Sequence, residues 1–175
     1  MKKISALLAA ILFLVILTPL RAQEGSVMTI RVCDIDTMNA GDTSILGYVF
    51  MEQYKLDDYQ EEAYMKVYKP TMEEVRKAEK LLRSKYFSIM PPERRDRFGK
   101  EDRPRLKTYT RQYIFGIDAE GKLYVWVNAI KNNEYDPVKL KKGLVCVRDG
   151  GNYFWHTLLN ISDGKVLSVT VNGEA

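Results

Sequence analysis

The sequence has one histidine, His156, and only two cysteines, Cys33 and Cys146, among its 175 residues. A zinc centre needs about four Cys, His or carboxylate ligands at characteristic spacings, and these three distant residues cannot supply one. We therefore expect no metal site and no cofactor. A small disulfide-rich scaffold is excluded as well, because such a domain depends on several bridges.

An excess of charge of one sign is also missing from most of the chain. The whole sequence carries 27 Lys and Arg against 23 Asp and Glu. Three of the basic residues, Lys2, Lys3 and Arg21, fall in the first 22 positions, which hold no acidic residue. The remainder has 24 basic against 23 acidic residues, a charge of +1, whereas binding to nucleic acid draws on a basic surface. We expect no nucleic acid partner.

Only one long hydrophobic run is present, at the N-terminus. Two lysines precede an apolar stretch over residues 4–17, and Pro19 and the small residue Ala22 follow it. This order is typical of a secretory signal peptide, whereas a membrane-spanning helix needs ~20 apolar residues. We expect cleavage near Ala22, export to the periplasm or the medium, and no transmembrane segment in the mature chain. A retained N-terminal anchor is the alternative.

Cys33 and Cys146 each lie in a run that is typical of a strand, "IRVCDI" and "LVCVRD". In an exported protein the two thiols could form one disulfide. A free cysteine that packs as a small hydrophobic residue fits such a run equally well, so both alternatives stay open.

The chain after the leader, residues 23–175, has the usual size of one domain. Alternating apolar and polar residues over 27–35 predict a strand, and 44–51 is a second strand or the start of a helix. Apolar residues at helical spacing over 56–67 predict a helix that Pro70 ends.

The clearest pattern is "TMEEVRKAEKLLRSKYF" at 71–87, which predicts an amphipathic helix. Thr71 and Glu74 have the spacing of a capping box. The apolar residues form one stripe along the helix: Met72, Val75, Ala78, Leu81, Leu82 and Tyr86. The prolines and charges over 88–107 then predict a long exposed loop, either a basic contact patch or a solvated linker.

The rest of the chain has five segments typical of strands: 109–117, 122–130, 143–147, 152–162 and 165–173. Turn sequences "DAEG" and "DG" join two pairs of them as hairpins, which makes neighbouring strands antiparallel. The sequence therefore predicts an α+β fold in which the amphipathic helix packs on a curved antiparallel sheet.

The position of His156 depends on the second hairpin. A two-residue turn at 163–164 would pair Ser162 with Lys165 and place His156 opposite Val171, on the apolar face that the helix covers. We then expect a neutral, hydrogen-bonded imidazole at the edge of the core. A catalytic or ligand-binding role is the alternative, although no motif brings a serine or cysteine nucleophile to it.

The first hairpin predicts a recognition surface. A four-residue connection at 118–121 would pair Tyr113 with Trp126 and gather an aromatic face around Arg111. Tyr, Trp and Arg carry much of the binding energy at interfaces. The hypothetical binding residues are therefore Arg111, Tyr113, Tyr124, Trp126 and His156. A three-residue connection with a bulge would dissolve this face, and packing of the rings in the core is a further alternative.

The order of one helix and then a meander is similar to the cystatin-like roll, and more loosely to peptidase propeptides and NTF2-like folds. The segments "RQYIFGIDAEGKLYVWVN" and "VRDGGNYFWHTLLNISDGKVLSVTVNGEA" resemble the C-terminal half of small secreted bacterial proteins. This resemblance implies a fold over 71–175 and no chemistry. The Q-x-V-x-G loop of inhibitory cystatins is absent, so the resemblance does not imply protease inhibition.

No nucleophile–base pair, phosphate-binding glycine loop or metal-ligand spacing is found in the sequence. We therefore expect a non-enzymatic exported module that binds a protein, a peptide or a glycan, as a monomer or a homodimer. The alternative is a small-ligand-binding or enzymatic domain that uses a pocket between helix and sheet.

Overall fold

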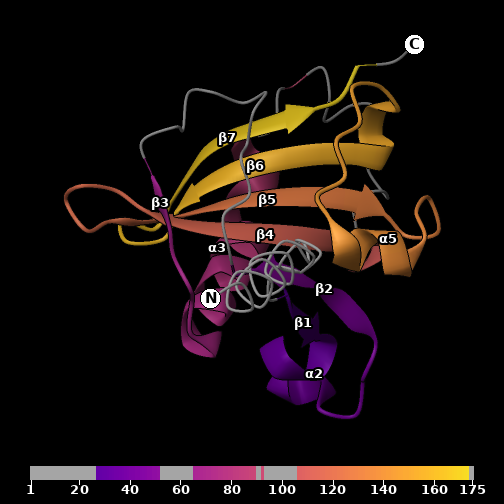
Figure 1. Cartoon of the computed structure of the whole chain (residues 1–175), viewed down its shortest axis with the longest axis horizontal. Helices are drawn as coiled ribbons and strands as arrows, with labels where there is room; N and C mark the ends of the chain where they lie inside the picture. Colours follow the sequence, from indigo (N-terminus) through magenta and orange to yellow (C-terminus); the bar gives the residue numbers. More distant parts are fainter. Residues whose placement is uncertain (1–26, 52–64, 90–91, 93–105, 174–175) are drawn as a thin grey trace, which may run out of the picture.

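The computed structural model contains one open, seven-stranded, mostly antiparallel sheet (Figure 1). It describes residues 27–51, 65–89, 92 and 106–173. The expected leader, most of the helix predicted over 56–67 and most of the loop predicted over 88–107 lie outside the described residues. The strands are β1 (Val27–Arg31), β2 (Ile45–Phe50), β3 (Lys66–Val67), β4 (Tyr109–Ile117), β5 (Leu123–Lys131), β6 (Phe154–Asn160) and β7 (Lys165–Val171).

The strands follow the order β1-β2-β4-β5-β6-β7, and β3 pairs with the C-terminal end of β4. All pairs are antiparallel except β2 with β4, which are parallel. A parallel pair needs a long connection, and the chain between these two strands contains the 18-residue helix α3 (Met72–Ile89). β2 and β3 lie one after the other along the same edge of β4.

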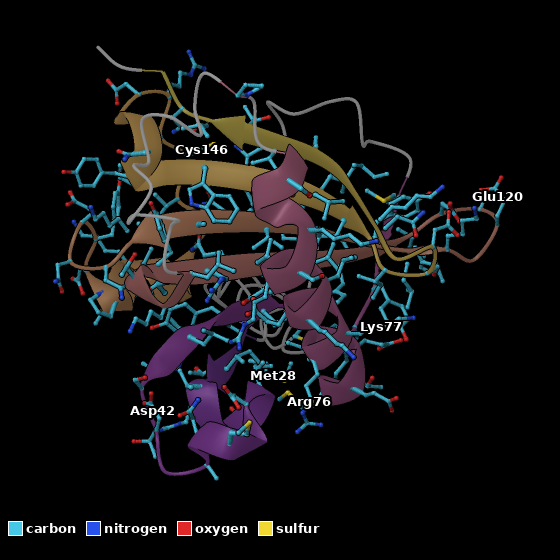
Figure 2. All side chains as sticks on the ribbon, turned by 180° about the vertical axis from the view of Figure 1, so that it is seen from behind. Met28, Asp42, Arg76, Lys77, Glu120 and Cys146 are labelled. Atoms are coloured by element: carbon cyan, nitrogen blue, oxygen red, sulfur yellow. The ribbon has the colours of Figure 1, made fainter. Side chains whose placement is uncertain are left out.

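α3 covers one face of the sheet, against β6 and β7 (Figure 2). Its predicted capping box is confirmed: Thr71 Oγ1 accepts from the Glu74 amide at 3.3 Å, and Glu74 Oε2 accepts from the Thr71 amide at 2.7 Å. The predicted stripe faces the sheet, since Val75, Ala78, Leu81 and Leu82 are all buried. No helix in the described part of the chain is long and apolar enough to cross a membrane.

A second layer covers part of the other face of the sheet. It consists of the short helix α5 (Pro137–Lys142) and the irregular segment 143–149 (Figure 1). Beneath it lies a separate hydrophobic cluster, formed by Tyr48, Phe50, Ile114, Trp126, Ile130, Leu140 and Val145. The sheet is therefore packed on both of its faces.

Three predicted elements differ from the structure. The strand predicted over 27–35 ends at Arg31, because residues Val32–Ile35 turn into the short helix α2. Val67, predicted to end a helix, lies in β3. The strand predicted over 143–147 is not formed, because side chains of the sheet hold that segment in place of a strand ladder. The C-terminal meander thus has four strands and not five.

The hairpin registers also differ from the prediction. Ile117 pairs with Leu123, so the first connection has five residues. In the second hairpin Asn160 pairs with Lys165, and a bulge separates Leu158 from Leu159. The reason is packing: Ile161 is buried in the core on the α3 side, and the Asn160 side-chain oxygen accepts from the Asp163 amide at 2.8 Å.

The register of the second hairpin exchanges the two faces of β6, whereas Val171 of β7 stays on the α3 side. Trp155 and Leu159 belong to the core beneath α3, whereas Phe154 packs against the cluster on the opposite face. His156 pairs with Thr170 and points to the same side as Phe154. The prediction that His156 lies opposite Val171, at the seam between helix and sheet, is therefore wrong.

Candidate functional site

A groove of about 490 Å³ opens at the end of the sheet where β2 and β4 begin and β5 ends. In Figure 1 this is the end of the sheet beside α5. The sheet contributes the side chains of Ile45, Tyr48, Thr110 and Lys131 to its lining. The chain from β5 into α5 contributes the rest: Asn132, Asn133, Tyr135, Asp136, Pro137 and Leu140.

Local backbone chemistry shapes the wall of the groove between β5 and α5. The Glu134 amide donates to the Lys131 carbonyl at 3.1 Å, which closes a tight turn. Asn133 occupies the left-handed region of that turn, with φ 72°, and asparagine tolerates this conformation better than most residues do. Asp136 then starts α5, because its carboxylate accepts from the Val138 amide at 2.8 Å and Pro137 follows as the first helical residue.

Some polar side chains of the groove are held by hydrogen bonds, and others make none with the described residues. Thr110 Oγ1 donates to Asn132 Oδ1 at 3.0 Å, and Asn132 Nδ2 donates to the Lys107 carbonyl at 3.1 Å. These two bonds hold the Asn132 amide in one orientation. The side chains of Asn133 and Tyr135 make no hydrogen bond with any residue that the structure describes. Both therefore present polar atoms to a ligand.

The floor of the groove is apolar and buried. Tyr48 and Leu140 are both almost fully buried there. The Tyr48 hydroxyl lies 3.4 Å from the Pro137 carbonyl, to which it donates, and burial raises the pKa of this hydroxyl. Tyr48 is therefore neutral at physiological pH. An apolar floor with a few fixed polar groups at its rim is the general form of a ligand-binding site.

The structure separates the five residues predicted to bind. Arg111 and Tyr113 point to the α3 side of the sheet and are fully buried. The side chains of Tyr124, Trp126 and His156 lie on the other face of the sheet. Because the first connection has five residues, the aromatic face that depended on a four-residue connection is not formed.

Arg111 and Tyr113 belong to a buried ionic network centred on Glu79 of α3. The Tyr113 hydroxyl donates to Glu79 Oε1 at 2.7 Å, and Arg111 Nε lies 3.4 Å from the same oxygen as an ion pair. The second carboxylate oxygen accepts from Arg83 Nε at 3.1 Å. Burial and the negative charge of Glu79 hold the pKa of Tyr113 well above its usual value, so Tyr113 remains a donor. The network ties α3 to β4.

On the other face, Trp126 and His156 contact each other, with ring centroids 5.9 Å apart. They line a cavity of only about 10 Å³ together with Cys146, Asn128 and Asn172. Such a volume is close to the minimum for one water molecule, so it has no room for a substrate. Tyr124 lies apart from this cavity and bonds the Asp118 carboxylate in the hairpin loop, which raises the pKa of Tyr124.

Both cysteines are free thiols in the structure. Cys33 lies on α2, which packs beside β1 and α3. Cys146 is exposed on the segment that covers the opposite face of the sheet, near β6 (Figure 2). The bridge between Cys33 and Cys146 that the sequence left open is not present.

Three side-chain amides hold the second layer on the sheet. Gln112 Nε2 donates to the carbonyls of Leu140 and Gly143, at 2.8 and 2.7 Å. Asn128 Nδ2 donates to the Val145 carbonyl at 2.8 Å. Asn172 Nδ2 donates to the carbonyls of Val147 and Asp149. The irregular segment 143–149 is thus bound to the sheet, and α5, which forms one wall of the groove, is anchored at its C-terminal end.

Sequence reasoning missed the groove, because its lining comes from segments that are far apart in the chain. Two local signals were present in "NNEYDP" at 132–137: a pair of asparagines typical of a turn and an Asp-Pro pair typical of a helix start. They indicate a turn and a helix, but neither indicates that β2 and β4 complete a cavity beside them.

The chain matches no protein-family model, no curated protein and no solved structure. Its similarity to the cystatin-like class therefore stays a prediction.

Replacement of Glu79 by Gln tests the buried network. The change leaves the Arg111 guanidinium buried without its counter-ion, and loss of one partner of a buried pair costs roughly 3–5 kcal/mol. We expect that reduction in the free energy of unfolding, measured by urea denaturation. Glu73→Gln, on the exposed side of the same helix, is the control and should change it by less than about 0.5 kcal/mol. Equal midpoints for the two variants would show that Glu79 has no structural role.

The pH dependence of stability tests the environment of His156. Burial lowers the pKa of its imidazole from the ordinary value of 6.5. The unfolded chain therefore binds more protons than the folded protein as the pH falls through 6.5. The contribution of neutral His156 to the free energy of unfolding is therefore complete above pH 6.5. It is lost as the pH falls toward the lower pKa of His156 in the folded protein. We expect the unfolding free energy of the wild type to fall in this range relative to that of His156→Gln. Parallel curves for the two proteins would contradict this placement.

Proposed function

We propose that this protein is an exported, non-enzymatic recognition module that binds its ligand in the groove between the sheet end and α5. The observation that carries the proposal is the groove itself, in which unused polar groups of Asn133 and Tyr135 stand above a buried apolar floor. Its size lies within the range of ~300–1,000 Å³ that is usual for ligand sites. The signal-peptide pattern of residues 1–22 supports export.

The construction of the groove favours binding, because its walls are fixed before a ligand arrives. Asn132 is held by two hydrogen bonds, Asp136 caps α5, and Gln112 anchors the end of that helix. A preformed site loses little conformational entropy on binding, which raises affinity. The part of the lining that the structure describes has no histidine or cysteine, and its one carboxylate, that of Asp136, is engaged in the helix cap.

The surroundings of the groove suit a ligand that is part of a larger surface. Three large apolar residues at or beside the groove are exposed: Ile45, Val138 and Tyr153. Ile45 is part of the lining, Val138 follows Pro137 of the lining in the chain, and Tyr153 contacts Lys131 of the lining. Exposed apolar groups that surround a polar site are a common feature of interaction surfaces. A protein, a peptide, a glycan or a second copy of the chain are the partner classes that such a surface can contact.

An enzymatic role for His156 in a pocket between helix and sheet has less support. The space beneath α3 holds a hydrophobic core and the Glu79 network, and His156 faces away from it. The small cavity beside His156 leaves no volume for a substrate.

Nuclear magnetic resonance titration of the purified protein tests the proposal. The ligands are four mixtures, of short peptides, neutral oligosaccharides, acidic oligosaccharides and nucleotides. We expect shifts of the backbone amides of 131–136 with at least one mixture, and recovery of the ligand unchanged after incubation.

The outcome that contradicts the proposal is equally specific. Shifts that cluster at Trp126, Cys146 and His156, or chemical conversion of a ligand, would move the functional site to the other cavity. No shift at 131–136 with any mixture would remove the groove as a binding site.

A further inference from the structure

We infer that the ligand of the groove is a neutral saccharide, an inference that rests on the proposed function of this site. The groove combines an uncharged overall lining, an aromatic and apolar wall, and hydroxyl and amide groups at hydrogen-bonding positions. Each of these features matches a property of a sugar ring, and the balance of charge favours a neutral sugar over an acidic one.

The charges of the lining favour a ligand without net charge. Among the described residues of the lining, Lys131 is the one cation, and its ammonium nitrogen lies 4.4 Å from the centroid of the Tyr153 ring, a cation–π contact that partly satisfies it. The one carboxylate among these described residues, that of Asp136, accepts from the Val138 amide. The two opposite charges cancel, so an anionic ligand would meet as much repulsion as attraction. A neutral ligand has no such conflict.

The two walls suit the two surfaces of a sugar. A pyranose has C–H groups on its faces and hydroxyl groups around its edge. The Tyr135 ring packs edge-to-face against Phe154, with centroids 6.2 Å apart, and together with the Pro137 ring it gives the lining an apolar surface for the faces. The Asn133 amide offers both a donor and an acceptor for the edge, and Thr110 Oγ1, whose proton is used by Asn132, offers lone pairs.

The turn leaves the side-chain amide of Asn133 on the lining of the groove. The turn needs a residue in the left-handed region at this position, and glycine would satisfy that need with less strain. Asparagine adds an amide that contacts no described residue through a hydrogen bond and lines the groove. A ligand with adjacent hydroxyl groups can bond the donor and the acceptor of this amide together.

The test is binding of the purified protein to an array of neutral and acidic glycans. Isothermal titration of the neutral oligosaccharide with the strongest signal follows. We expect saturable binding to neutral glycans. Asn133→Gly keeps the turn and removes the amide, and loss of its hydrogen bonds should weaken binding about tenfold. Tyr135→Phe keeps the ring and removes only the hydroxyl, so its affinity should fall less than that of Tyr135→Ala.

Glu134→Ala is the matched control, because Glu134 is exposed in the same turn but does not line the groove. It should bind as the wild type does. Thermal melting of each variant separates loss of binding from loss of folding, and Asn133→Gly should melt within a few degrees of the wild type.

Three results would overturn the inference: no binding across the array, tighter binding to acidic glycans, or equal affinity of the wild type and a folded Asn133→Gly variant. If the array shows no binding while peptides or nucleotides still shift the amides of 131–136, the saccharide assignment fails and the proposed function of the groove stands. If no ligand class shifts those amides, both fail.

Discussion

The side-chain amide of Gln112 connects the sheet to its second layer. Its nitrogen donates to the carbonyls of Leu140 and Gly143, and its oxygen accepts from the Val145 amide and from Asn128 Nδ2, at 2.9 and 3.0 Å. Gln112 is fully buried, so each of these bonds satisfies a group that would otherwise lie in the interior without a partner. Gln112 thus fixes the end of α5 and the start of the segment after it, and α5 in turn forms a wall of the groove.

The two faces of the sheet are therefore stabilised in different ways. On the α3 face, a continuous apolar core surrounds the ionic network of Glu79, Arg111 and Tyr113. On the other face, a smaller apolar cluster lies beneath a backbone that side-chain amides hold. Buried charges and amides specify one arrangement of their partners, since any other leaves a polar group unsatisfied. The groove lies where the second face reaches the end of the sheet.

Local patterns in the sequence were sufficient to predict the long helix and the hairpins. Thr71 and Glu74 form the expected cap, and the apolar stripe of that helix contacts the sheet, because both signals act within a few residues. The fold class followed from the order of these elements and is confirmed. The registers did not follow, because they depend on tertiary packing. Burial of Ile161 lengthens the second connection, and one residue of shift in register exchanges the faces of a strand.

The dependence on tertiary packing also explains why the sequence did not predict the candidate site. Arg111 and Tyr113 were predicted to bind a partner. The five-residue connection instead pairs Tyr113 with Val127 and not with Trp126, and both side chains contact Glu79 of α3. The groove needs Thr110, Asn133 and Tyr48 together, from three strands or loops whose contact is set by Gln112 and by the parallel pairing of β2 with β4. No single stretch of sequence contains that information.

The dependence of the second layer on Gln112 is tested most directly by hydrogen exchange at the Val145 amide, which donates to Gln112 Oε1 at 2.9 Å. In the wild type we expect strong protection of this amide. In Gln112→Ala we expect it to exchange at least tenfold faster, while the amides of α3 keep their protection, because the two layers are held by separate contacts. Equal protection of Val145 in both proteins would contradict the account, and so would loss of protection throughout α3.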